Sequence, residues 1–284
     1  NSPEGRRAGT ALANVFFGVL WPLKQDLDAL AKAYYLPHYS SRRPCSFCPA
    51  STDPDDEKMR WNNFKADASW PSLLYSAEVW RAAVKPKHHL FKLPYISNFN
   101  IEVDELHIIH LGTSMYMLGS VLWLLCYRIL SEAPSQNMSR VWAWICAEYR
   151  EAKTACQYTN LKLSSFCEPD RAHLAYPKLK GRGAEVKDLV LPLLDIWSRV
   201  KREHNHGDDV VESMLRNQAK LQSILSEYAH DTFLEVDVSS EIFQTVKPIL
   251  REYTFLAKQA DDRGDLLFPI TPKFHWSWHC GHRA

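Results

Sequence analysis

The sequence predicts a mixed α/β fold in which helix predominates. Apolar residues recur at helical spacing through most of the chain from about residue 108 to 260, a period that places them on one face of amphipathic helices. A short apolar and aromatic run near the N-terminus instead has the length of a buried strand. The chain has 284 residues, 46% of them hydrophobic and 24% charged, a composition typical of a globular protein with a sizeable core. No fixed-period repeat is visible, so a solenoid is not expected.

The N-terminal part of the chain is predicted to hold a strand, a helix and an irregular segment. Residues 12–24 carry the strand, whose apolar run ends at Pro22, and a helix follows from Asp26 to Tyr35. Asp26 and Asp28 stand in its first turn, where acidic side chains suit the helix macrodipole. Residues 50–72 are acidic and lack periodicity, which indicates a solvated surface excursion.

The centre of the chain contains its most apolar segment. Ile108–Tyr127 is a run of 20 residues without Asp, Glu, Lys or Arg, which is long enough for a membrane span. Polar residues and two glycines dilute the run and Arg128 closes it, so a buried core helix is the favoured interpretation, with a single-span membrane protein as the alternative. Further helices are predicted over four ranges: Met138–Cys156, Glu185–His204, Asp208–Ala229 and Glu241–Gln259.

Composition and motif content exclude several classes of protein. Lys+Arg 34 against Asp+Glu 33 gives a net charge of +1, so any nucleic-acid contact must be local, for example at the small basic segments Lys85–His89 and Lys178–Arg182. Neither GxGxxG nor GxxxxGK[ST] occurs, which argues against a dinucleotide site and a P-loop. The odd number of cysteines, seven, and the absence of a secretory signal predict a nuclear or cytoplasmic protein with reduced thiols, and not a secreted one.

The sharpest local motif is Cys45-Ser-Phe-Cys48, the spacing at which two thiolates from one tight turn bind a single zinc ion. A zinc site needs two further ligands, and His275-x3-His279 supplies a pair on one helical face. Cys280 and His282 are possible substitutes for these histidines. Two unrelated reduced cysteines and a thioredoxin-type redox pair remain as alternatives.

Two acidic positions are candidates for a second metal site. Asp26 follows the predicted strand, and Asp104-Glu-Leu-His107 precedes the long apolar run. Each acid can simply cap a helix. If each follows one of two neighbouring strands, the carboxylates can instead hold Mg²⁺ for phosphoryl transfer, because hard divalent cations prefer oxygen ligands. His107 would then be a positioning group, or else a satisfied core histidine.

Taken in order, these features resemble the layout of the RNase H-like DDE transposases of eukaryotic cut-and-paste elements. The similarity is to the CACTA and Plavaka/KDZ types and to the related recombination-activating recombinase, which carry a catalytic Asp before a CxxC, a helical insertion and then a His pair. The segment that ends at Asp26 resembles the family's strand and turn, with Gln25 where the family has Gly. Asp104-x2-His107 is similar to its D-x2-H signature, and Pro272-Lys-Phe-His275 to its Pro-Lys-x-His. Pro44–Pro49 and Leu106–Leu125 also resemble transposon-derived dinoflagellate proteins.

The resemblance implies a partial RNase H-like core interrupted by a large all-α insertion. The implied divisions are a core with the CxxC in residues 1–50, an irregular excursion with the D-x2-H segment in 51–107, the helical insertion in 108–270 and a His-rich return segment in 271–284. It implies a structural zinc at Cys45, Cys48, His275 and His279, and Asp26 as a Mg²⁺-binding carboxylate, with Asp28 near enough to compete.

The implied parent activity is Mg²⁺-dependent cleavage and transfer of DNA strands at transposon ends, by a protein that can form homo-oligomers. The family's other two catalytic acids would lie outside residues 1–284, so this chain alone is expected to be inactive. A non-catalytic, zinc-stabilised interaction domain is the alternative.

Overall fold

The structure is a computed structural model that describes residues 22–231 and 234–284. It is predominantly helical, as the sequence predicts, with one small sheet in the described part of the chain. The apolar run that led to the strand prediction over residues 12–24 lies almost entirely outside the described residues. At its end, strand β1 (Leu23–Gln25) follows Pro22.

The sheet consists of β1 and β2 (Ile101–Val103), which pair in parallel with Leu23 opposite Ile101 and Gln25 opposite Val103. Helix α1 (Leu27–Tyr34) begins directly after β1, because the Asp26 carboxylate accepts a hydrogen bond from the Ala29 amide at 2.7 Å and caps the helix. The carboxyl ends of both strands therefore lie side by side, and each is followed at once by an acidic residue, Asp26 or Asp104.

The predicted long apolar helix runs from Leu106 to Ile129, with α3 (Met115–Leu124) as its regular centre and wider π-helical turns on both sides. It is long and apolar enough to cross a membrane, but 83% of its most apolar window is buried inside the protein. This burial fits the core-helix interpretation. The backbone of Leu111 departs from helical geometry and kinks the first part.

The remaining helices follow the predicted periodicities with shifted ends. The range 185–204 contains two helices, of which the first ends at Asp188 and the second begins at Val190. The helices are α4 (Pro134–Glu151), α5 (Gly183–Asp188), α6 (Val190–Val200), α7 (His206–Glu227), α8 (Val236–Asp261) and α9 (Pro272–Arg283).

Residues 35–100 contain short 3₁₀ turns and one helix, α2 (Ala77–Val84), which starts at a Ser76 cap on the Val79 amide. The acidic cluster near Asp55 is exposed, as predicted. The same segment nevertheless sends Trp70 into the core, where its side chain is fully buried. The prediction of a simple surface excursion over residues 50–72 is therefore wrong in part, since an aromatic side chain in an aperiodic segment can still fill a core position.

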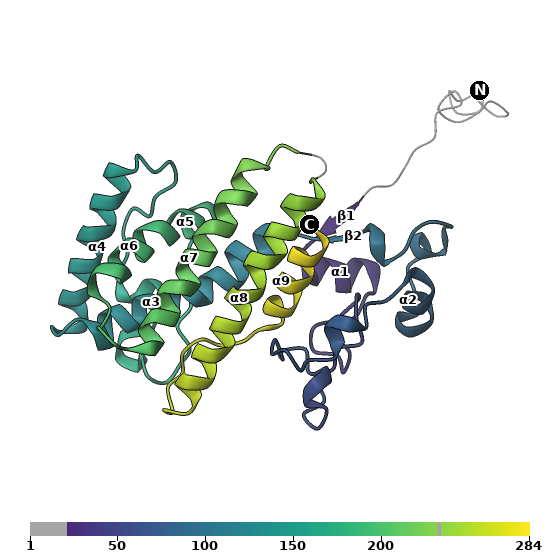
Figure 1. Cartoon of the computed structure of the whole chain (residues 1–284), viewed down its shortest axis with the longest axis horizontal. Helices are drawn as coiled ribbons and strands as arrows, with labels where there is room; N and C mark the ends of the chain where they lie inside the picture. The colour runs from purple at the N-terminus through teal and green to yellow at the C-terminus, as the bar shows by residue number, and fades with distance from the viewer. Residues whose placement is uncertain (1–21, 232–233) are drawn as a thin grey trace, which may run out of the picture.

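Helix α9 lies between the two parts of the molecule (Figure 1). The helices α3 to α8 form one side, while the sheet, α1 and α2 form the other. α9 contacts α8, the start of the long apolar helix and β2. Helix α9 thereby brings the C-terminal part of the chain back to the sheet.

Candidate metal centre

Four buried side chains lie close together, two from the turn after α1 and two from α9. The Sγ atom of Cys45 lies 3.3 Å from Nε2 of His279, and that of Cys48 lies 3.3 Å from Nε2 of His275. The two Nε2 atoms are 3.2 Å apart, and all four donor atoms lie within 4.8 Å of one another. All four residues are buried. The structure thus brings together the four residues that the sequence predicts as zinc ligands.

Local structure places each pair of ligands. Cys45 and Cys48 lie in a tight turn whose Phe47 amide donates to the Cys45 sulfur at 3.2 Å, an interaction that favours the thiolate. His275 and His279 are four residues apart on α9 and so project from one face of it. Pro272 in the first turn of this helix suits a helix start, since its missing amide would have no partner there.

The imidazole of His275 is oriented by a second contact that sequence reasoning did not find. Its Nδ1 donates to the carbonyl oxygen of Trp61 at 2.8 Å, which leaves Nε2 free to face the sulfur atoms. Trp70 packs over the site, with its ring 4.3 Å from that of His275 and 5.8 Å from that of His279. The indole of Trp70 in turn donates to the Asn63 carbonyl at 2.9 Å. No sequence signal marks these contacts, because they depend on tertiary packing.

The environment of the cluster shifts the pKa values of its two thiols in opposite directions. Burial opposes ionisation of Cys45, but a hydrogen bond from Cys48 and the charges of the two histidines outweigh it and hold the pKa of Cys45 well below its usual value. Burial and the neighbouring Cys45 sulfur raise the pKa of Cys48 well above its usual value. Burial also lowers the pKa of His279, which favours the neutral imidazole that a metal ligand requires.

The donor set and spacing fit a tetrahedral ion. With metal–nitrogen and metal–sulfur bonds of about 2.0–2.3 Å, a tetrahedron places neighbouring donors roughly 3.3–3.8 Å apart. Three of the donor pairs here are separated by 3.2–3.3 Å. Two thiolates also balance the charge of a divalent cation, which reduces the cost of burying it. The cluster can therefore hold a metal ion such as zinc.

Cys280 and His282, the possible substitutes on α9, lie outside the cluster. Cys280 is not part of the cluster, and burial raises the pKa of its thiol to about 12. His282 stacks on Trp278 with ring centres 4.9 Å apart. None of the seven cysteines, all of which lie in the described part of the chain, forms a disulfide.

The predicted catalytic acids lie at the carboxyl ends of the two paired strands. Asp26 caps α1 through the Ala29 amide. Asp104 accepts a hydrogen bond from the Leu106 amide at 2.9 Å and contacts Nδ1 of His107 at 2.7 Å. Burial opposes ionisation of Asp104, but these two contacts outweigh it and lower its pKa.

Within the residues that the structure describes, no group of three or more His, Cys, Asp or Glu side chains converges other than the Cys₂His₂ cluster. Asp26, Asp104 and His107 do not by themselves form a three-ligand site. Asp28, the competing acid, forms an exposed ion pair with Lys32 at 2.7 Å.

The chain was compared with protein-family models, with curated proteins and with solved structures, and none of them matches it.

Proposed function

We propose that Cys45, Cys48, His275 and His279 bind a structural zinc ion, and that the chain is part of an RNase H-like, transposase-derived protein. Asp26 and Asp104 would supply oxygen ligands for Mg²⁺ in cleavage and transfer of DNA strands. The observation that carries this proposal is the parallel pairing of β1 and β2, which sets the two acids side by side. The sequence resemblance supplies the reaction class.

The zinc would be structural because the four protein ligands complete its tetrahedron and leave no position for a substrate. All four are buried, and Trp70 covers the two histidines. The ion would join the turn after α1 to α9, which comes back to the sheet after the whole helical region. This clip is what would keep both ends of the described chain in one unit.

The acids would act through their placement at the edge of the sheet. When Mg²⁺ is bound, it supplies charge stabilisation for the attacking and leaving oxygens of phosphoryl transfer. On the protein side, the lowered pKa of Asp104 keeps its carboxylate ionised at neutral pH, and His107 fixes the orientation of one of its oxygens. The backbone of β2 holds Asp104 in register with β1 through a bond from its amide to the Gln25 carbonyl at 3.2 Å.

A non-catalytic, zinc-stabilised interaction domain is the second candidate, and a specific observation favours it. One Asp26 oxygen is engaged in capping α1, and both Asp104 oxygens have partners within their own turn. Acids used in this way need no metal to satisfy them.

Divalent-ion binding separates the two candidates. Mn²⁺ titration of the zinc-loaded chain, followed by electron paramagnetic resonance of the free ion, would compare wild type with Asp26→Asn, Asp104→Asn and the matched control Asp28→Asn. The proposal expects Mn²⁺ binding that Asp26→Asn and Asp104→Asn each weaken, while Asp28→Asn leaves it unchanged. No Mn²⁺ binding by wild type, or equal binding by all four proteins, would favour the non-catalytic domain.

A further inference from the structure

A stretch of chain without acidic residues begins in helix α2, which lies at the opposite end of the molecule from α4 (Figure 1). Residues 79–101 contain four Lys and Arg side chains and no Asp or Glu. The nearest acids along the chain are Glu78 before it and Glu102 after it. This part of the surface therefore carries a local excess of positive charge on a chain whose overall charge is only +1.

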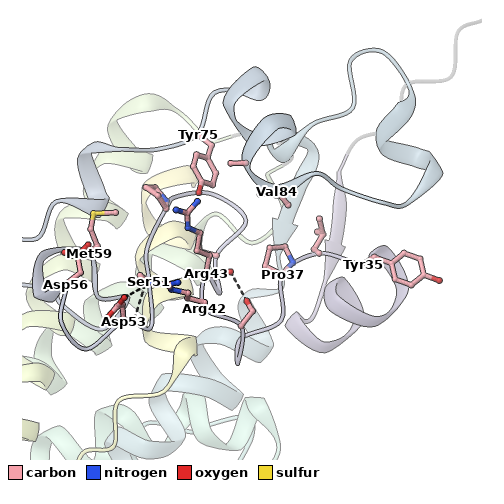
Figure 2. A pocket seen from close by; sticks show the side chains of 15 residues that line it. Tyr35, Pro37, Arg42, Arg43, Ser51, Asp53, Asp56, Met59, Tyr75 and Val84 are labelled. Carbon is pink, nitrogen blue, oxygen red and sulfur yellow. Dashed lines mark hydrogen bonds and ion pairs between the residues drawn. The ribbon is translucent and has the colours of Figure 1, made fainter.

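The neighbouring pocket beside the metal-binding turn has no such excess (Figure 2). It has a volume of about 730 Å³, and its lining pairs two arginines, Arg42 and Arg43, with two acids, Asp53 and Asp56. Because these charges cancel, the pocket favours neither an anion nor a cation. The positive charge lies outside the pocket, on the residues that follow Val84.

Residues 93–96 form a tight turn that exposes two large apolar side chains. The Ile96 amide donates to the Leu93 carbonyl at 3.4 Å. Pro94 and Tyr95 lie between them, and Tyr95 has a φ of 74°. Proline followed by a residue with positive φ is the pattern of a type II turn, whose third residue is usually glycine or asparagine. Leu93 is 52% exposed and Tyr95 is 92% exposed. A bulky aromatic side chain thus occupies a position that favours glycine, and it extends into solvent.

Buried side chains hold this turn at both ends. Phe91 precedes it and packs against the buried Trp80, with ring centres 5.2 Å apart. Ile96 at its end is buried, and its carbonyl accepts a hydrogen bond from the Arg81 guanidinium at 2.8 Å. These anchors maintain the left-handed backbone of Tyr95. Glycine would remove the strain without loss of packing, so an exposed tyrosine kept at this position indicates a function for its side chain.

Three lysines precede the turn and have no acidic partner. Lys85, Lys87 and Lys92 are exposed, and none of their side chains forms an ion pair or hydrogen bond with the residues that the structure describes. Helix α1 packs against this part of the chain. It contributes Lys32 and Asp28, which form an ion pair with each other at 2.7 Å. The three lysines therefore remain available to an external anion.

We infer that the 93–96 turn and the three lysines bind the surface of an anionic membrane. Leu93 and Tyr95 enter the interfacial layer, where a tyrosine is favoured because its ring is apolar and its hydroxyl is polar. The lysine ammonium groups face the anionic lipid headgroups, and each adds to the attraction. Binding of this kind is peripheral, so the long apolar helix Leu106–Ile129 stays buried in the core.

A membrane fits these features better than another macromolecule does. A stable protein interface buries about 1,200 Å² or more in total, and two apolar side chains on a small turn supply little of that area. A lipid surface requires no matching shape and accepts a few apolar side chains beside a basic cluster. A nucleic acid would leave Leu93 unused, because bases stack on aromatic rings and not on an aliphatic side chain.

Flotation of the zinc-loaded chain with lipid vesicles tests this inference. Phosphatidylcholine vesicles with about 30% phosphatidylserine should bind wild type, and salt should weaken this binding. Vesicles of phosphatidylcholine alone should bind about tenfold more weakly. Joint substitution of Lys85, Lys87 and Lys92 by Gln should weaken binding about a hundredfold, since each lysine contributes about fivefold. Leu93→Ala combined with Tyr95→Ala should weaken it about tenfold and leave its salt dependence unchanged.

A second variant separates binding from stability. In Tyr95→Gly, glycine adopts the positive φ without strain, so this variant should unfold at a higher temperature than wild type. It should nevertheless bind the vesicles several-fold more weakly, because the aromatic side chain is gone. Weaker binding by a more stable protein cannot result from unfolding. Tyr95→Gly that binds as wild type does would contradict the inference.

The loop before α5 offers a matched control for the turn, with an exposed leucine and tyrosine at the same spacing, Leu174 and Tyr176. The cations that follow them already have partners. Lys178 lies over a tyrosine ring at 5.4 Å, Lys180 donates to a backbone carbonyl at 3.0 Å and Arg182 pairs with a glutamate at 2.7 Å. Leu174→Ala combined with Tyr176→Ala should therefore bind the vesicles as wild type does.

Joint substitution by Gln of three exposed lysines elsewhere, Lys58, Lys153 and Lys162, removes the same charge and controls for the lysine variant. It should weaken vesicle binding far less. The inference is overturned if wild type does not bind the phosphatidylserine vesicles, or if the turn and lysine variants bind no differently from their controls. A labelled DNA oligonucleotide is the last comparison. Tighter binding of this probe than of the vesicles, lost in the lysine variant but kept in the turn variant, would mean a nucleic-acid site and would also overturn it.

Discussion

Removal of the metal is predicted to cost the fold about 5 kcal/mol of unfolding free energy. Cys48 and His275 are 227 residues apart, so a metal that joins them closes almost the whole described chain into a loop. Cross-linking a loop of this length removes roughly 5 kcal/mol of entropy from the unfolded chain at 25 °C, by the same chain-entropy argument that is used for disulfides. This corresponds to between three and four orders of magnitude in the unfolding equilibrium.

Urea unfolding with and without a zinc chelator measures this effect, followed by tryptophan fluorescence and by circular dichroism. The chelator should shift the midpoint strongly downward in wild type and in Cys156→Ser, which alters an exposed cysteine outside the cluster. It should have no further effect on Cys48→Ala, which already lacks a ligand. An unchanged midpoint in chelator-treated wild type would refute the reasoning, because a metal clip over so long a loop cannot be neutral.

Three further predictions concern packing, hydrogen bonding and pH. Trp70→Ala should destabilise the protein by about 3–5 kcal/mol, because the buried indole fills the space against His275 and Trp278; Trp70→Leu should cost less, and urea unfolding compares the two. Asn137→Ala should cost about 1–3 kcal/mol, since the two N–H groups of this fully buried amide lie within hydrogen-bond distance of three backbone carbonyls between α3 and α4. An equal loss in the exposed variant Gln136→Ala would contradict this. Burial raises the pKa of Glu252 in the folded protein above its ordinary 4.5, although hydrogen bonds from neighbouring side chains act in the opposite direction. As the pH rises, the carboxyl group therefore loses its proton in the unfolded chain before it does so in the folded protein. The free energy of unfolding falls as the pH rises from 4.5 through the folded pKa. Glu252→Gln should therefore stabilise the protein at pH 7 and have little effect below pH 4.5, measured as the difference in urea midpoint from wild type.

The helices and the metal ligands were the parts of the structure that the sequence could predict. Apolar periodicity located α4, α6, α7 and α8, since each buries one face against its neighbours. The CxxC and H-x3-H spacings identified four residues that the fold brings within one ion's reach. Spacing works here because each pair of ligands depends only on local geometry, a tight turn in one case and one helix face in the other.

Other features depend on tertiary packing and left no local signal. Trp70 lies in an aperiodic, partly acidic stretch, yet it is buried against the histidines of α9. The carbonyl of Trp61 that orients His275 has no side-chain signature at all. Strand β2 has only three residues, too few for a two-residue alternation to stand out. The relative position of Asp26 and Asp104 follows from the pairing of that strand with β1, and only the structure reveals the register.

The central claim is that one zinc ion joins Cys45 and Cys48 to His275 and His279. X-ray absorption spectroscopy at the zinc edge of the purified protein, combined with elemental analysis of wild type, Cys45→Ser and His275→Ala, tests it most directly. We expect about one zinc per chain with two sulfur neighbours near 2.3 Å and two nitrogen neighbours near 2.0–2.1 Å, and loss of the ion in either variant. A protein that contains no zinc, or one whose zinc content does not change in His275→Ala, would contradict the account.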